Sequence, residues 1–373
     1  MYAFVSHGSA CESLRLLSTT NSLSALPRWP SEPRALPYMG ECVSNQRTFK
    51  EFRTAHDLAR FGACSGPVDL LVPDQRMRSS GKSARFHVWS SPVKPAWFVR
   101  VESDVLVSSP EFVIMQLCGS QAKFNEVFEA HVRAYRKRLA AFQSLGIDEK
   151  PAVDHPVKWE QSRRLIAAAL VACEFAGTYR LAVGDKATTY GASPLIACDS
   201  LREAAGPKTT TVSRRAHHVA RVMLEGSASP METSLGLILT LPVDLGGYGI
   251  KKPLLNIPIC VDEGAADFLG QQEIRPDFLW PEERVALEYD SAEFHSEKGA
   301  ALAARDAARA NALTALGYRV FRVTPQLISS PAGLDLIAAQ LASALGCELR
   351  PPTPVEELRR REVFSLLFPN PLA

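Results

Sequence analysis

The sequence predicts a multi-domain α/β protein, and three observations lead to that prediction. The chain has 373 residues, which at roughly 100–200 residues per domain corresponds to two or three domains. Short apolar runs bounded by Gly, Pro and Ser occur between residues 50 and 120, as in strands. Further on, apolar residues first recur at helical spacing, and then helix and strand patterns alternate. We therefore divide the chain into a small α+β domain (1–120), a helical region (121–225), an α/β domain (226–350) and a C-terminal tail (351–373).

The composition excludes several classes of protein. Hydrophobic residues make up 46% of the chain and charged residues 22%, which is enough for packed cores and unlike a disordered chain. No run of about 18 apolar residues is present, so we expect no membrane-spanning helix and no membrane partner. The 42 Lys and Arg residues against 40 Asp and Glu give a net charge of +2. That balance excludes a histone-like basic coat and still permits a local patch that binds nucleic acid.

The cysteines and the N-terminus indicate a cytoplasmic protein. The eight cysteines are scattered without a C-x-x-C pair, which argues against a zinc knuckle or a thioredoxin-type motif. We expect buried free thiols in a reducing compartment. The first residues, MYAFVSHGSACESLRLL, lack the basic start and apolar run of a signal peptide.

The α+β domain is predicted to begin with loops. Four prolines in residues 26–37 exclude a helix interior there, and a short helix is expected at 7–17. Strands are predicted at 67–74 and from Arg85 onward, and residues 97–110 are expected to form a pair of strands. Ser109, followed by Pro and Glu, predicts the start of a helix.

The helical region carries two groups of basic residues. Helices are predicted at 122–142, 161–177, 200–206 and 211–226. Basic residues cluster at 133–138 and again at Arg214, Arg215, His217, His218 and Arg221. Such a cluster is either an ordinary solvated helix face or a surface that contacts phosphates. On the second reading Arg214 and Arg215 are candidates for DNA contacts.

The α/β domain is predicted to run helix, three strands, helix, strand and helix. Gly317 is the expected C-cap of the middle helix, and the charged stretch 355–368 of the tail is also helix-like. The helices are expected at 229–241, 298–317 and 330–346, and the strands at 256–260, 274–281, 284–290 and 318–324.

Three carboxylates are predicted to meet where two of these strands lie side by side. Asp277 lies on one strand, and Glu288 and Asp290 lie two residues apart on the next, hence on one face. The short W-P-E-E turn between the strands predicts an antiparallel pair, which brings the acids together. Clustered carboxylates repel unless a cation neutralises them, and Mg²⁺ takes one or two carboxylates with waters and phosphate oxygens. The residues therefore favour a metal site that hydrolyses phosphate esters.

Four further residues are candidates for the same site, each with an ordinary alternative. His295, just beyond the second strand, could be a general base or hold a water, or it could be a surface histidine. Glu232 fits a capping box in S-P-M-E, and a role near the metal is the competing account. Arg305 and Arg309, four apart on a helix, could both face a phosphate. An ordinary helical ion pair between Asp306 and Arg309 is the alternative.

The order of these motifs resembles the PD-(D/E)XK nuclease superfamily, most closely its very-short-patch-repair (Vsr)-like endonucleases. The similarity covers about residues 227–328 and includes S-P-M-E-T-S-L, R-P-D-F, E-Y-D-S-A-E-F-H, R-D-x-x-R-x-x-x-L and G-Y-R-V-F-R-V-T. It implies a restriction-endonuclease-like, mixed four-stranded sheet flanked by helices. It also implies a Mg²⁺- or Mn²⁺-dependent phosphodiesterase that acts on DNA, in phage defence or DNA repair. The resemblance makes Asp277 a metal ligand, Glu288 the second carboxylate, His295 the general base or water-orienting group, and Glu232 a helix-borne acid.

One position departs from the superfamily pattern and leads to a second hypothesis. Asp290 replaces the lysine that orients the nucleophilic water. The Vsr-like branch also lacks that lysine and uses nearby histidines, so His295 could compensate. Superfamily members that have lost catalytic residues bind DNA without cutting it. A DNA-binding regulator is therefore the alternative. A third possibility is a structural or interaction protein in which these acids are ordinary surface residues.

The upstream region favours the regulator through a second resemblance. The segments S-H-G-S-A, V-D-L-L-V-P and V-L-V-S-S-P-E-F-V-I-M-Q-L are similar to parts of AbiEi-type abortive-infection antitoxins. Such antitoxins are transcriptional autoregulators, and their partner is a cognate toxin. Their recognition helix lies in an N-terminal winged helix, and residues 1–50 of this chain contain no such helix, which argues against a simple repressor.

Overall fold

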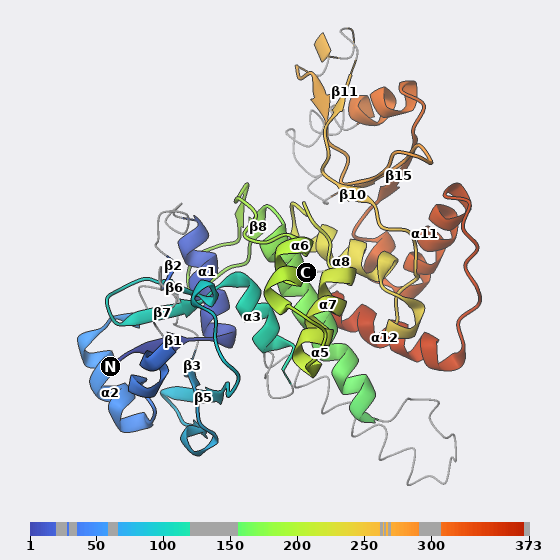
Figure 1. The fold of residues 1–373 in the computed structure, drawn as a ribbon. Coiled ribbons are helices and arrows are strands. Elements are labelled where there is room, and N and C mark those ends of the chain that lie inside the picture. The colour runs from blue at the N-terminus through green and yellow to red at the C-terminus, as the bar shows by residue number, and fades with distance from the viewer. Residues whose placement is uncertain are drawn as a thin grey trace, which may run out of the picture. The chain divides into compact units, whose positions relative to one another are not determined.

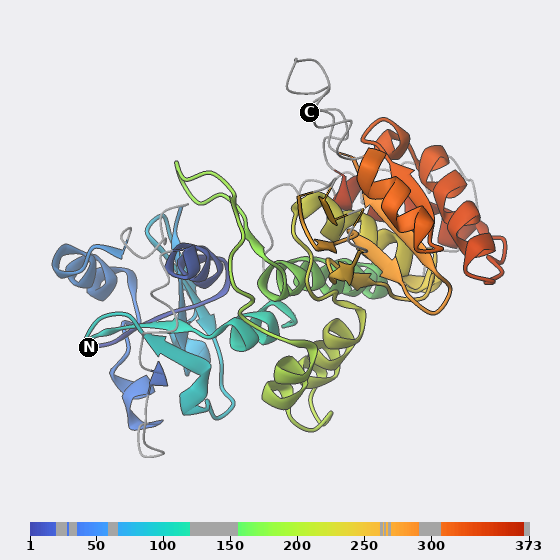
Figure 2. The same cartoon turned by 90° about the horizontal axis from the view of Figure 1, so that it is seen from above.

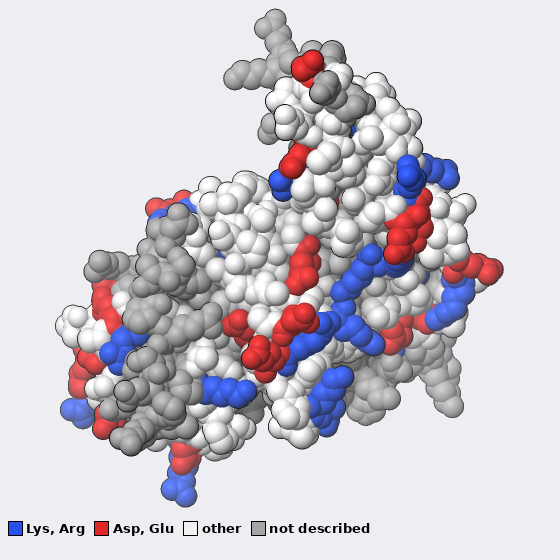
Figure 3. Space-filling model, turned by 45° about the horizontal axis from the view of Figure 1, so that its top comes forward, with Lys and Arg blue, Asp and Glu red and all other residues white. Residues whose placement is uncertain are grey.

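The structure is a computed structural model and divides into two compact units (Figure 1). It describes residues 1–19, 28–29, 36–58, 66–119, 156–261, 264, 266–267, 270–290 and 307–368. The N-terminal unit comprises Met1–Ala141 and Glu160–Met223, and the C-terminal unit comprises Phe142–Trp159 and Leu224–Ala373. Within the described residues, no helix is both long and apolar enough to cross a membrane. On the face drawn in Figure 3, basic and acidic side chains lie interspersed, in keeping with the balanced net charge.

A seven-stranded mixed sheet forms the core of the N-terminal unit. Its strands are β1 (Ala3–Val5), β2 (Arg28–Trp29), β3 (Val68–Val72), β4 (Ser79–Ser80), β5 (Ala84–Val88), β6 (Phe98–Arg100) and β7 (Val105–Ser108). They lie in the order β2-β6-β7-β1-β3-β5-β4. β1 pairs in parallel with β7, β3 pairs in parallel with β5, and the other neighbours are antiparallel. Every residue of β1, β3 and β7 is buried, because these near-continuous apolar runs lie at the centre of the sheet.

Helices surround this sheet and extend the unit. α1 packs on β3 and β7 and against α3, and α3 in turn contacts both α6 and α7. Ser109 caps α3 by accepting a hydrogen bond from the Phe112 amide, as the sequence predicts. The helices are α1 (His7–Thr19), α2 (Gln46–Ala55), α3 (Pro110–Leu117), α5 (Pro156–Ala176, which enters the unit at Glu160), α6 (Cys198–Ala205) and α7 (Thr211–Val222). After α5, the chain forms the antiparallel pair β8 (Tyr179–Arg180) and β9 (Thr189–Tyr190).

The C-terminal unit contains a four-stranded mixed sheet with helices around it. Its main strands are β10 (Leu254–Leu255), β13 (Phe278–Trp280), β14 (Val285–Tyr289) and β15 (Arg319–Val323), in the order β10-β13-β14-β15. The first three are antiparallel neighbours, and β15 runs parallel to β14. β11 (Ile259–Cys260) and β12 (Glu273–Ile274) form a separate pair. The helices are α8 (Pro230–Thr240), residues 307–315, α11 (Pro331–Ala344) and α12 (Pro354–Leu367).

The two faces of this sheet are covered by different helices. Gly236 of α8 faces Phe278, because a Cβ atom at Gly236 would come within 2.9 Å of the Phe278 ring. The next residue, Leu279, packs with Ala286 and with Leu313 of helix 307–315. Side chains alternate along a strand, so α8 and helix 307–315 lie on opposite faces.

The predicted fold class is confirmed as a mixed α/β protein with a four-stranded mixed sheet. The predicted W-P-E-E hairpin is present, with Trp280 opposite Val285. The predicted short helix at 7–17 is confirmed as α1, whereas the prediction of a loop-rich start missed β1, which lies at the centre of the large sheet, and the start of α2 at Gln46. β1 has three residues, all buried, which is too short for any periodicity to register. The expected helix 122–142 lies outside the described residues, as does the expected helix 298–317 before residue 307.

The predicted buried free thiols are confirmed at four of the described cysteines, and the prediction of burial is wrong for two others. Cys11, Cys42, Cys118 and Cys173 are free and buried, while Cys260 and Cys347 are free and exposed. Burial raises the pKa of the Cys11 thiol to about 12, so this side chain behaves as a small apolar residue.

Candidate active site

Asp277 and Glu288 face each other across the β13–β14 pair. Phe278 pairs with Leu287 and Leu279 with Ala286, and extending this register by one residue places Asp277 opposite Glu288. Asp277 Oδ2 accepts a 2.6 Å hydrogen bond from the Tyr289 amide at the end of β14. Like charges directly opposite each other destabilise a sheet, so the backbone holds two acids together against their own repulsion.

The pKa of Asp277 reflects this repulsion between the acids. Burial, together with the negative charges of Glu232 and Glu288, raises the pKa of Asp277 from 3.8 to about 8. The Tyr289 amide and the Arg309 guanidinium act in the opposite direction and only partly offset the rise. Near neutral pH the Asp277 carboxyl therefore keeps its proton unless another cation is present.

Glu232 joins this site from α8. Its side chain is buried, and Oε2 accepts 2.8 Å hydrogen bonds from the Ala228 amide and from Asn256 Nδ2. Ser229 Oγ accepts from the Glu232 amide, so Ser229 is the N-cap as predicted. The second half of the predicted capping box is different, because the Glu232 carboxylate binds the Ala228 amide and not the Ser229 amide. Glu232 thus binds the backbone at the helix start and also lies close enough to repel Asp277, and its role near a metal stays a prediction.

Two arginines reach the acids from neighbouring elements. Arg309 Nη2 of helix 307–315 lies 3.3 Å from Glu288 Oε2 and donates to the Arg275 carbonyl at 2.9 Å. Arg322 of β15 pairs in register with Glu288, and its Nε lies 2.8 Å from Asp290 Oδ2. Asp290 is therefore neutralised by a cationic side chain from the next strand.

Asp277 and Glu288 form a pair with Glu232 nearby, and these described residues do not form a complete metal-binding cluster. Within the part of the chain that the structure describes, no group of three or more His, Cys, Asp or Glu side chains is placed to hold a metal ion. The predicted ligands Asp277 and Glu288 stand opposite each other, while Asp290 is bound to Arg322. The candidates His295 and Arg305, and Asp306, lie outside the described residues.

Asn256 is a supporting residue that the sequence patterns did not reveal. Its backbone has φ of 54°, a left-handed conformation that asparagine tolerates better than most residues. Its amide N–H donates to the Pro276 carbonyl at 3.1 Å, and Nδ2 donates to Glu232 and to the Gly226 carbonyl. Asn256 thereby connects the segment before Asp277 to Glu232. An isolated asparagine in a loop carries no spacing signal that could have identified it.

Replacing Gly236 by Ala is expected to disturb this arrangement. A Cβ atom would lie 2.5 Å from Leu224 Cδ1 and 2.9 Å from the Phe278 ring. The overpacking costs about 1–3 kcal/mol and exceeds the helix-propensity gain of about 1 kcal/mol. We expect a lower urea midpoint and a lower Asp277 pKa, since α8 and Glu232 move away from β13. Gly40→Ala is the control, because a Cβ there has open space; equal midpoints for the two variants would contradict the close packing.

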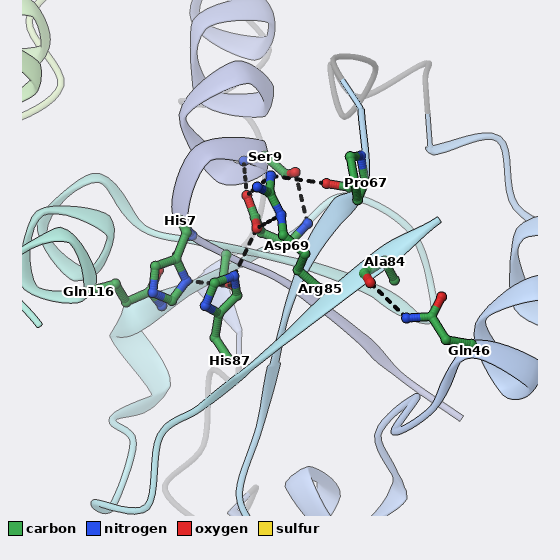
Figure 4. Close-up of polar contacts among 10 residues, drawn as sticks. His7, Ser9, Gln46, Pro67, Asp69, Ala84, Arg85, His87 and Gln116 are labelled. Atoms are coloured by element: carbon green, nitrogen blue, oxygen red, sulfur yellow. Dashed lines mark hydrogen bonds and ion pairs between the residues drawn. The ribbon is translucent and has the colours of Figure 1, made fainter. Parts of the chain in front are cut away.

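A second polar cluster lies in the N-terminal unit (Figure 4). Asp69 of β3 lies 2.8 Å from His87 Nε2 and 2.9 Å from Arg85 Nε. The His87 ring stacks on His7 at a centroid distance of 3.9 Å, and the His7 amide donates to Gln116 Oε1 at 2.9 Å. Burial, followed by the charges of His87 and Arg85, lowers the pKa of His7 well below its usual value.

This cluster fixes the start of α1. His7 has φ of 49°, which costs energy for a residue other than glycine, and the contacts to β5 and α3 hold it there. Ser9 reinforces the link, since its Oγ accepts a hydrogen bond from the Asp69 amide and its own amide donates to the Asp69 carboxylate. Sequence reasoning did not identify the cluster, because its members are separated by tens of residues along the chain.

The candidate DNA contacts Arg214 and Arg215 lie in the N-terminal unit, on α7. Arg214 is exposed, whereas Arg215 Nη1 donates to the Cys118 carbonyl at 2.8 Å. The two neighbours therefore face in different directions, and Arg215 is an internal contact.

Comparisons with known proteins identify no relative. No protein-family model, no curated protein and no solved structure matches the chain. The function must therefore be argued from the site itself.

Proposed function

We propose that the chain is a metal-dependent phosphodiesterase that cleaves DNA. The observation that carries the proposal is the Asp277 carboxyl, placed opposite Glu288 and near Glu232 with its pKa raised to about 8. Acids forced together at one position of a sheet are typical of functional sites, where the unfavourable charge is compensated by a ligand.

Asp277 and Glu288 fit a hard divalent cation. Their donors are all carboxylate oxygens, which Mg²⁺ and Mn²⁺ prefer, and Mg²⁺ commonly needs only one or two of them from the protein. The repulsion that raises the Asp277 pKa is the repulsion that such an ion would relieve. When bound, the ion would supply hydroxide and stabilise the negative charge that develops on a phosphate.

The surrounding side chains supply the remaining functions of such a site. Arg309 and Arg322 bring two guanidinium groups beside the acids, and guanidinium matches the geometry of a phosphate. In the proposed site they neutralise the scissile phosphate and stand in for the missing superfamily lysine. Asn256 binds both Glu232 and the segment before Asp277, and the Glu232 carboxylate can accept a proton from water near Asp277.

A cleavage assay with a charge-matched variant tests the proposal. Supercoiled, linear, mismatched and single-stranded DNA are incubated with Mg²⁺ or Mn²⁺, and wild type is compared with Glu288→Gln. Loss of a metal ligand removes several kcal/mol of transition-state stabilisation, so the rate should fall by about 100-fold or more. Glu282→Gln, at an exposed residue of the β13–β14 turn, should cleave as fast as wild type. A folded Glu288→Gln protein that cuts at the wild-type rate would remove Glu288 from the mechanism.

A second candidate is a DNA-binding regulator that has lost catalysis. The ion pair between Asp290 and Arg322 favours it, because the position expected to activate water is occupied by an acid that is already neutralised. This candidate predicts DNA binding that weakens with salt and no cleavage with either metal. A cognate toxin would then be the expected protein partner.

A further inference from the structure

We propose that α6 and α7 form a helix-turn-helix whose second helix, α7, docks in the major groove of duplex DNA. This binding surface lies in the N-terminal unit, apart from the acidic site of the C-terminal unit. It goes beyond the proposed cleavage chemistry and does not depend on it.

The two helices have the form of this motif. Gly206, the C-cap of α6, has φ of 62° and turns the chain, and Thr210 caps the start of α7 by accepting a 3.0 Å hydrogen bond from the Ser213 amide. His217 of α7 lies 2.8 Å from the Gly206 carbonyl, which ties the turn to the second helix. The yellow-green helices lie against each other in Figure 2, and α3 packs on both of them. Two packed helices joined by a short glycine-containing turn, with a third helix behind them, are the core of a helix-turn-helix.

The faces of α7 are chemically distinct. Ser213, Ala216, Val219, Ala220 and Val222 are buried. The opposite stripe contains Thr211, Arg214, His218 and Arg221, at the spacing of one helix face. α7 contains no acidic residue, and the turn before it adds exposed Lys208. An amphipathic helix thus presents a purely basic and hydroxylic stripe away from its own core.

The contacts of the outward arginines leave their charges available. In the described structure, Arg214 donates to the Thr209 carbonyl and to Thr211 Oγ1, and Arg221 contacts His218 Nε2. None of these partners is a carboxylate. By contrast, Arg215 is committed to the Cys118 carbonyl and burial lowers its pKa, so it anchors α7 rather than binding a ligand.

Duplex DNA is the partner that this stripe fits. The first turns of a recognition helix contact base edges while the preceding turn contacts phosphates. Arg214, one turn into α7, is placed to bind a guanine edge in the major groove. Lys208, Thr209 and Thr211 are residue types that bind phosphate oxygens. The deep, narrow major groove of duplex RNA does not admit a helix, so DNA is expected to be preferred.

The test measures DNA affinity of the full chain by fluorescence anisotropy, in EDTA so that no cleavage occurs. We expect Arg214→Ala/Arg221→Ala to weaken binding to a duplex by about tenfold or more near 0.1 M salt and to flatten the salt dependence of the affinity. The matched control is Arg47→Ala/Arg53→Ala, which removes the same charge from exposed positions on α2. It should bind within about twofold of wild type, because exposed charges far from the contact are screened.

The outcomes separate this inference from the proposed cleavage. Equal affinity of the α7 variant and the α2 control would overturn it, and so would equal affinity of wild type for duplex RNA and duplex DNA. If the α7 stripe binds an acidic protein and not DNA, the wild-type protein will show no affinity for duplex DNA. That result would also overturn the inference. If Glu288→Gln leaves cleavage unchanged while the α7 variant still loses DNA affinity, the cleavage mechanism fails and this inference stands.

Discussion

Replacing Asp277 by Asn is expected to abolish metal-dependent DNA cleavage and to stabilise the metal-free protein at alkaline pH. Asn keeps an acceptor for the Tyr289 amide, which lies 2.6 Å from Asp277 Oδ2, so the fold should persist. It cannot ionise and is a poor ligand for a hard cation. The cleavage rate should fall by about 100- to 1,000-fold, which corresponds to several kcal/mol of lost transition-state stabilisation.

The stability change follows from the direction of the pKa shift. Asp277 has a pKa of about 8 in the folded state against 3.8 as its ordinary value, so between these values the folded state holds a proton that the unfolded state lacks. Folding stability therefore falls as pH rises through this window, by up to about 1.4 kcal/mol per pH unit, and levels off above it. Asp277→Asn lacks this fall. It should match wild type near pH 4 and be more stable than wild type at pH 9.

Urea unfolding at pH 5, 7 and 9, with EDTA or with Mn²⁺, measures both effects. A cation that binds the ionised carboxyl competes with its proton, so Mn²⁺ should raise the wild-type midpoint more at pH 9 than at pH 5. Asp277→Asn should show little response to Mn²⁺ at either pH. Asp185→Asn, at an exposed residue of the N-terminal unit, controls for the loss of one charge. A pH-independent Mn²⁺ effect shared by all three proteins would place the ion elsewhere.

The acidic pair was predictable from sequence because local rules determine it. The short W-P-E-E turn sets the register of β13 and β14, and that register alone puts Asp277 opposite Glu288. The contribution of Glu232 was left open, since S-P-M-E describes a helix start equally well. Glu232 lies near Asp277 because α8 approaches Phe278 closely at Gly236. A single glycine within a helix does not predict which strand that helix packs against.

The charge compensation could not be predicted from sequence. Arg322 reaches Asp290 because β15 is parallel to β14 in one specific register. A long connection joins these two strands, so no short turn in the sequence determines that register. The same holds for the N-terminal unit, where Asp69 and His87 meet His7 across three separate segments. Periodicity and capping are local signals, and contacts between distant segments depend on packing that these signals do not contain.

Glu174→Ala is expected to have the largest effect on stability. Glu174 of α5 is 1% exposed, and it accepts two 2.8 Å hydrogen bonds from Arg15 of α1 and one of 3.0 Å from the Leu181 amide. Removing the carboxylate leaves the guanidinium of Arg15, whose side chain is only 16% exposed, and the Leu181 amide without this partner. We expect unfolding of the N-terminal unit to become easier by about 3–5 kcal/mol, measured as a lower urea midpoint with an unchanged slope.

Two further variants determine whether burial of the pair is the cause. Glu51→Ala breaks an ion pair with Arg47 in which both side chains are 64% or more exposed, and should cost less than about 1 kcal/mol. Arg15→Met/Glu174→Leu removes both charges and keeps the volume, so it should recover much of the loss, because a buried ion pair is costly mainly when only one partner remains. If the double variant were as unstable as Glu174→Ala, the loss would come from the packing of the two side chains rather than from an uncompensated charge.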